Sequence, residues 1–150
     1  MITTHGTNEM QKTILDDADT RRVIGAIAHR ELVADSAPLN TEARYDKDGR
    51  CFVVRGGGKF AVVGAGFADW AIVTVTLTLN EQDNHGHHAF VVQLREGGAL
   101  RKVVSMRPIQ GEHPTMSASG VGALHFDNVR LPVFAMLLPS RIVGRGGNLR

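Results

Sequence analysis

The 150-residue sequence has a single cysteine, a single tryptophan and a single tyrosine, and no apolar run as long as a membrane span. Cys51 has no partner for an internal disulfide, and a cysteine-rich zinc site is excluded for the same reason. A bilayer span needs about 20 consecutive apolar residues. A signal peptide would need an apolar stretch where Asp16, Asp17 and Asp19 stand. We therefore expect a protein of cytoplasmic type with no membrane partner.

The excess of one sign of charge is also small, since 17 Lys/Arg stand against 15 Asp/Glu and the formal net charge is only +2. Residues 101–150 hold seven Lys/Arg against two Asp/Glu, but none of the aromatic residues lies in a basic cluster. A nucleic-acid surface combines basic groups with aromatic stacking platforms. The sequence therefore predicts no nucleic-acid partner, although the phosphates of coenzyme A are compatible with this local excess.

With 43% hydrophobic residues, the chain is long enough to bury one core. Residues 8–19 are predicted to form a short amphipathic helix, because Met10 and Ile14 are four residues apart and lie on one face. Residues 21–31 are apolar and bounded by charge, which favours a strand or an extended edge segment. The turn residues at 46–49 stand between two extended runs and predict a hairpin.

Strand alternation is clearest in "WAIVTVTLTLN", where threonines at positions 74, 76 and 78 separate apolar residues. This pattern predicts one buried and one wet face. Two later segments, "HAFVVQLR" and "GALHFDNVRLP", also alternate, and Pro132 marks the end of the last strand. The side chains predicted to point inward are Val73, Val75, Leu77, Leu79, Phe90, Val92, Leu94, Leu124 and Phe126.

The stretch "GGGKFAVVGAGFADWAIV", from Gly56 to Val73, is similar to the glycine turn of a dinucleotide-binding protein. That fingerprint requires a helix after the glycines, whose N-terminus binds the pyrophosphate. Here the following residues are β-branched and alternating, which predicts a strand. We therefore interpret the glycines as strand-to-strand turns and not as a cofactor loop.

Four segments resemble, in order and near the spacing, the middle domain of flavin-dependent acyl-CoA dehydrogenases and acyl-CoA oxidases. They are "GTNEMQKTILDDADTRRVIGAIAHRE", "KFAVVGAGFADWAIV", "HGHHAFVVQLR" and "LHFDNVRLP". The third segment is typical of the acyl-CoA oxidases in particular. The resemblance covers about residues 6–140. It implies a mostly β fold, a small β-barrel or orthogonal sandwich with one short N-terminal helix.

The resemblance also implies a chemistry, in which a carboxylate base removes the α-proton of an acyl-CoA thioester and a hydride passes to FAD. The family's base is a Glu on a helical C-terminal domain. We therefore expect this chain to be an inactive middle-domain fragment or reduced relative of a flavin-dependent acyl-CoA oxidase, contributing flavin and acyl-CoA contacts only. A cytoplasmic location is expected, or a peroxisomal one if the full-length protein is a eukaryotic oxidase.

The cofactor-binding positions that the resemblance implies include several departures from the family pattern. Arg30 stands where the family has a Thr that hydrogen-bonds the flavin, and Ala61 replaces an aromatic residue against which the flavin ring packs. These changes predict a chain that keeps the fold and has lost flavin binding, or a shifted site in which Arg30 pairs with a phosphate or carbonyl. The implied positions are Ala28, Arg30, Glu31, Ser36, Ala61 and Val63.

Two alternatives stay open at this point. The chain could be a non-catalytic binding or assembly module, and the loss of flanking domains predicts that it forms a homo-oligomer. It could also be a small metal-binding barrel of the cupin type, because His85 and His87 are two residues apart, although further ligands are not evident. We expect His29 and His125, which lie in apolar strands, to be hydrogen-bonded core or edge residues. The predicted organisation is a helical remnant at 1–20, a β domain at 21–140 and a tail at 141–150.

Overall fold

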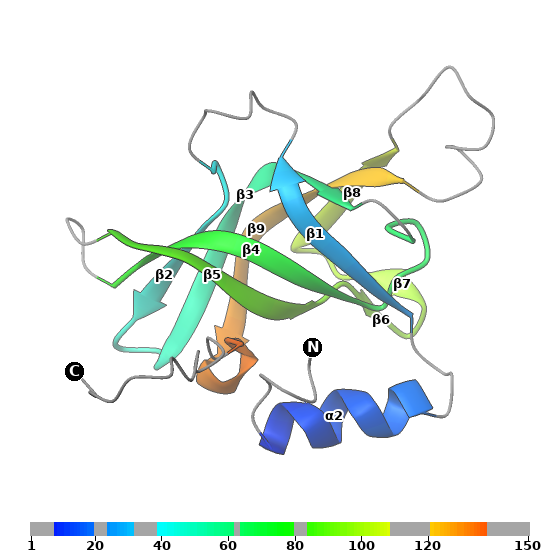
Figure 1. Ribbon diagram of the computed structural model, residues 1–150, viewed down its shortest axis with the longest axis horizontal. Helices are drawn as coiled ribbons and strands as arrows, with labels where there is room; N and C mark the ends of the chain where they lie inside the picture. The colour runs from blue at the N-terminus through cyan, green and yellow to red at the C-terminus, as the bar shows by residue number, and fades with distance from the viewer. Residues whose placement is uncertain are drawn as a thin grey trace, which may run out of the picture.

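The computed structural model describes residues 8–19, 24–31, 39–61, 64–79, 84–108 and 121–137 of the chain (Figure 1). The elements in chain order are α2 (Asn8–Asp19), β1 (Gly25–Glu31), β2 (Glu42–Asp46), β3 (Cys51–Ala61), β4 (Trp70–Thr78), β5 (Asn84–Gln93), β6 (Arg95–Glu96), β7 (Ala99–Leu100), β8 (Val104–Pro108), β9 (Gly122–Pro132) and the 3-10 helix η1 (Val133–Ala135). This confirms the predicted class, mostly β with one short N-terminal helix. The boundaries predicted near residues 20 and 140 lie outside the described residues.

Seven strands form one sheet, in the order β5, β4, β1 with β2, β3, β9 and β8. β1 and β2 share the position between β4 and β3, since each runs parallel to β4 and antiparallel to β3. β1 pairs with the first residues of β4, and β2 pairs with its last residues. We call this shared position the β1/β2 row. β6 and β7 form a separate two-stranded hairpin.

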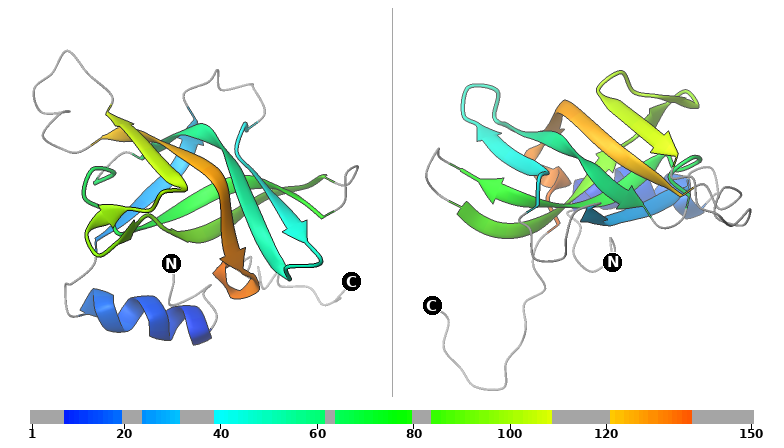
Figure 2. Two further views of the ribbon diagram at one scale, coloured as in Figure 1. Left: turned by 180° about the vertical axis from the view of Figure 1, so that it is seen from behind. Right: turned by 90° about the horizontal axis from the view of Figure 1, so that it is seen from above.

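The sheet curls into a half-barrel, which the view from above in Figure 2 shows. Its inner face is the main core, and all but one of the side chains predicted to point inward are at most 5% exposed. The prediction is wrong for Leu79, which is 37% exposed because β4 ends at Thr78 and the alternation ends with it. Phe90 packs edge-on against Phe52 at 5.0 Å between ring centroids, and Phe52 in turn contacts Tyr45. Each buried aliphatic or aromatic side chain of this kind contributes about 1.5–3 kcal/mol by leaving water. The alternation seen in the sequence therefore defines the core.

The glycine-rich stretch forms two different structures. Gly64 opens a tight turn with a φ of 80°, and the amides of Phe67 and Ala68 both donate to its carbonyl. Arg95, which follows β5 at the same end of the sheet, donates to the carbonyl of Gly66 at 2.6 Å and so fixes this turn. The prediction of a strand-to-strand turn is confirmed here, because the residues that follow form β4. It is wrong for Gly56 and Gly57, which lie inside β3.

Helix α2 packs on the outer face of the sheet, below β4 and β5 in the view of Figure 1. Met10 and Ile14 are 1% and 5% exposed, and together with Val91 of β5 they belong to a second apolar cluster. This confirms the predicted helical face. Within the described part of the chain, no helix is both long and apolar enough to cross a membrane.

Candidate functional site

The candidate site lies where the end of β1 meets the end of β3. Ala28 pairs with Ala61, Arg30 with Phe60 and Glu31 with Lys59, and a bulge interrupts the register between residues 28 and 30. The backbone thus brings Ala28, Arg30, Glu31 and Ala61 together from segments about 30 residues apart in sequence. Ser36 and Val63, the other two predicted positions, lie outside the described residues.

Glu31 is the buried charged group of this site, with 9% of its surface exposed. Its two carboxylate oxygens accept hydrogen bonds from the backbone amides of Asn40, at 2.6 Å, and Thr41, at 2.9 Å. A carboxylate that accepts backbone N–H groups holds them firmly, because bonds to a charged acceptor are the stronger ones. Glu31 therefore joins the end of β1 to the segment that leads into β2. Its role at a cofactor site stays a prediction.

Arg30 differs from Glu31 in being exposed to solvent. Among the described residues, its guanidinium has no hydrogen bond and no carboxylate partner. Ala28, two residues earlier, is completely buried in the main core. Among the described side chains of this site, Arg30 is therefore a cation without a partner, which suits an anionic or carbonyl oxygen.

Two glycines of β3 permit this packing, a role that the sequence analysis did not assign to them. Gly56 has a φ of 111°, and a Cβ built there would lie 2.9 Å from the Cα of Thr41. A Cβ on Gly57 would overlap the ring of His125. Because only glycine avoids both conflicts, β3 can pass directly under residue 41 and beside β9.

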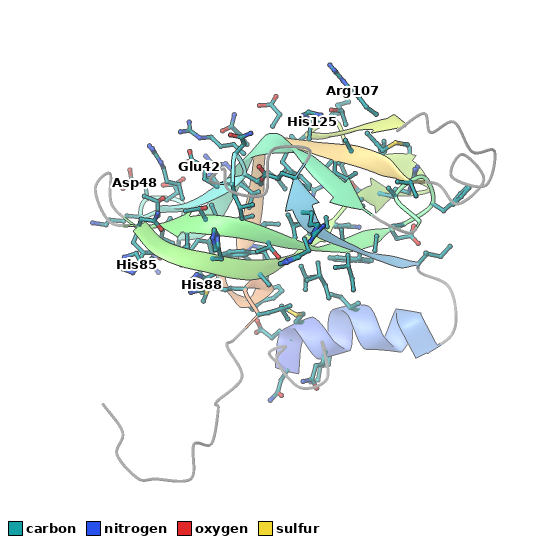
Figure 3. All side chains as sticks on the ribbon, turned by 45° about the horizontal axis from the view of Figure 1, so that its top comes forward. Glu42, Asp48, His85, His88, Arg107 and His125 are labelled. Carbon is teal, nitrogen blue, oxygen red and sulfur yellow. The ribbon has the colours of Figure 1, made fainter. Side chains whose placement is uncertain are left out.

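His85 and His88 lie near each other on β5, and His125 lies apart from them on β9 (Figure 3). His29 Nδ1 lies 3.1 Å from the hydroxyl of Thr74, which confirms the predicted hydrogen bond, although β1 lies between β4 and β3 and is not an edge strand. His85 and His87 are exposed at the start of β5, whereas the Nδ1 of His88 is buried and has no hydrogen-bond partner among the residues that the structure describes. In the described ranges, no three His, Cys, Asp or Glu side chains are grouped so that they could hold a metal ion.

The fold is similar to part of the acyl-CoA oxidases. Arabidopsis thaliana acyl-CoA oxidase 1 has 28% identity and a TM-score of 0.77, over 91% of this chain and 22% of that one. Yarrowia lipolytica acyl-CoA oxidase 1 has 27% identity and a TM-score of 0.79, over 97% of this chain and 23% of that one. Acyl-CoA oxidase-2 of Caenorhabditis elegans, whose structure contains FAD, ascaroside-CoA and ATP, has 28% identity and a TM-score of 0.79, over 92% and 22%.

The chain therefore spans about a fifth of the length of these oxidases, and the resemblance found in the sequence is confirmed by the fold. No protein-family model and no curated protein matches the sequence.

Proposed function

We propose, from this similarity to acyl-CoA oxidases, that the chain forms one wall of a flavin and acyl-CoA site of the oxidase type. The observation that carries the proposal is the meeting of the implied positions Ala28, Arg30, Glu31 and Ala61 at one strand pair of a matching fold. The carboxylate base would come from another part of an oxidase. The described residues alone are proposed to bind and orient, and not to turn over, an acyl-CoA thioester.

The residues present fit FAD only in part. Arg30 offers unpaired donors to a flavin carbonyl or phosphate oxygen, in keeping with its exposure. Alanine at position 61 offers little surface to an aromatic ring. When bound, the flavin would accept the hydride from the acyl chain, and the end of β1 would serve to hold its edge. We therefore expect weak FAD binding by the native chain.

The test restores the family residues. FAD is titrated against the native protein and against the double variant Arg30→Thr/Ala61→Trp, with binding read from flavin fluorescence and anisotropy. The double variant should bind FAD about tenfold more tightly, because a stacked aromatic pair contributes up to about 1.5 kcal/mol. Arg44→Thr on β2, another exposed strand arginine, is the matched control and should not change the affinity.

If neither the native nor the restored protein binds FAD or an acyl-CoA, the flavin-site proposal is wrong and the chain is better described as a non-catalytic assembly module. Loss of FAD binding in the double variant, with native binding intact, would instead support a shifted site that depends on Arg30.

We also propose that the chain forms a homo-oligomer. Ile24, Ile27 and Phe67 are large apolar side chains that are 51%, 59% and 61% exposed, and contact with another copy of the chain would remove them from water. β5 and β8 are the outer strands of the sheet, and such edges pair readily with another copy. Light scattering after size exclusion should give a mass above that of one chain. A monomer at high concentration would contradict this.

A further inference from the structure

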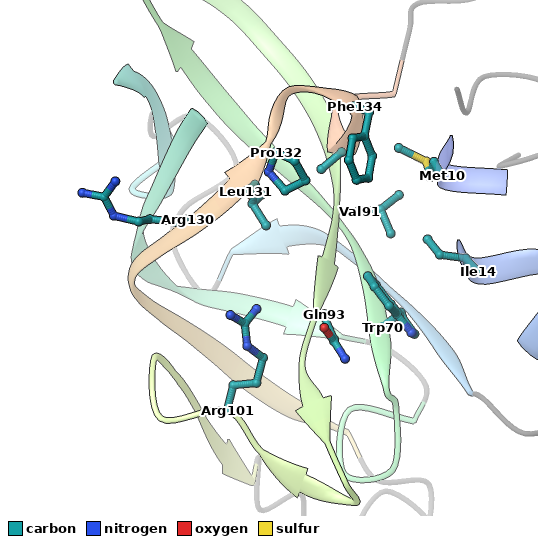
Figure 4. Close-up of a pocket in the computed structure, with 11 residues that line it drawn as sticks. Met10, Ile14, Trp70, Val91, Gln93, Arg101, Arg130, Leu131, Pro132 and Phe134 are labelled. Atoms are coloured by element: carbon teal, nitrogen blue, oxygen red, sulfur yellow. The ribbon is translucent and has the colours of Figure 1, made fainter. Parts of the chain in front are cut away.

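A pocket of about 290 Å³ opens between α2, the outer face of β4 and β5, and the end of β9. Figure 4 shows its lining. Eight of the lining side chains are apolar, namely Met10, Ile14, Trp70, Val91, Leu131, Pro132, Phe134 and Ala135. The remaining three, Gln93, Arg101 and Arg130, are polar and carry no negative charge. The pocket is separate from the strand pair that ends β1 and β3.

Two of the three polar groups, Gln93 and Arg101, lie at one end of this pocket, and Arg130 lies apart from them beside Leu131. Figure 4 shows Arg101 and Gln93 away from Phe134 and Pro132, so an apolar end faces a cationic one. The backbone of Arg101 is fixed, because its amide donates to Leu94 and its carbonyl accepts from Val104, both at 2.9 Å.

The two arginines of the pocket differ in whether their guanidinium groups have a carboxylate partner. Arg130 donates to the carboxylate of Asp46 at 3.2 Å. By contrast, neither the guanidinium of Arg101 nor the carboxamide of Gln93 hydrogen-bonds to any other residue within the described ranges. A guanidinium that borders an apolar pocket without a partner is a donor set suited to a carboxylate. The pocket therefore offers one free anion-binding end.

We propose that this pocket binds a small monocarboxylate with an unbranched apolar tail. A heavy atom with its hydrogens fills about the volume of one water, roughly 30 Å³, so the 290 Å³ pocket accommodates about ten heavy atoms. An eight-carbon monocarboxylate has ten. Its tail would lie against Val91 and Phe134, and its carboxylate would accept from Arg101 and Gln93. Ligand pockets of this kind are mainly apolar with a few convergent polar groups.

Trp70, which lines the pocket, is the only tryptophan of the chain and reports on its occupancy. We would titrate the full chain with octanoate and follow the tryptophan fluorescence. Saturable binding is expected, with octan-1-ol about tenfold or more weaker, because it lacks the charged acceptor. Arg101→Gln should weaken octanoate binding to the level of octan-1-ol and leave the affinity for octan-1-ol unchanged.

Arg107→Gln on β8 is the matched control, since Arg107 is exposed and does not line the pocket. Circular dichroism of each variant checks that the fold is retained, and the comparison of octanoate with octan-1-ol on native protein needs no variant. The proposal is overturned if octanoate does not bind, if both ligands bind equally, or if Arg107→Gln weakens octanoate as much as Arg101→Gln. FAD binding is a separate readout and distinguishes failure here from failure at the β1 and β3 site.

Discussion

Replacing Glu31 by Gln should destabilise the fold more than any comparable change of an exposed carboxylate. Each oxygen of Glu31 accepts one backbone amide, at 2.6 and 2.9 Å, in a site that is only 9% exposed. A glutamine keeps one acceptor and turns the other atom into a donor that faces an N–H group. A hydrogen bond to a charged group contributes about 1.5–3 kcal/mol, so we expect Glu31→Gln to lower the free energy of unfolding by about 2–3 kcal/mol.

Urea unfolding at neutral pH, followed by the fluorescence of Trp70, would measure this difference. Glu42→Gln is the control, because Glu42 pairs with Arg55 at the surface, where their side chains are 28% and 51% exposed. Surface pairs of this kind contribute less than about 1 kcal/mol. If Glu31→Gln lowered the stability no more than Glu42→Gln, the argument that Glu31 holds the β1/β2 row together would be refuted.

Three further changes test other parts of the fold. Arg50 has a φ of 48°, so Arg50→Gly should raise the unfolding free energy by about 1 kcal/mol, and a lowered urea midpoint would contradict this. The hydrogen bond from the Gly49 amide, and to a lesser degree the charge of Arg130, lower the pKa of Asp46. The ionised Asp46 carboxylate therefore stabilises the fold at pH values above the ordinary aspartate pKa, and this stabilisation is lost as the pH falls through the lowered pKa of the folded protein. Asp46→Asn should therefore flatten the acid side of the stability–pH curve, and an unchanged curve would count against it. Met10→Ala should lower stability by about 2–5 kcal/mol and expose α2 amides to hydrogen exchange.

The strands and the core could be predicted because their signals are local. In β4, threonine and valine alternate over adjacent positions, and the buried side chains follow that alternation without exception from Ala71 to Leu77. The hairpin of β2 and β3 could also be predicted from the sequence, since its turn residues lie between the two strands that they join. Short strands such as β8, with "VSMRP", carry too few residues for the same period to stand out.

The candidate sites could be predicted only where the family pattern named their residues. The clamp of Glu31 on residue 41 joins positions ten apart, and the bond from Arg95 to Gly66 joins positions 29 apart. Neither contact has a local signature in composition or spacing. The pocket between α2 and the sheet is lined by five segments between Met10 and Ala135, so no single stretch of the sequence predicts it.

The β1/β2 row determines where the chain could be divided into two fragments that reassociate. β1 is held on both sides by strands that come later in the chain, through main-chain pairing with β4 and β3, and it ends at Glu31 before β2 begins at Glu42. A peptide of residues 1–31 and a second piece beginning at Leu39 should therefore reassociate without a covalent link. Fused to the two halves of a reporter enzyme, such pieces would form a complementation pair whose recovery depends on main-chain pairing along β1.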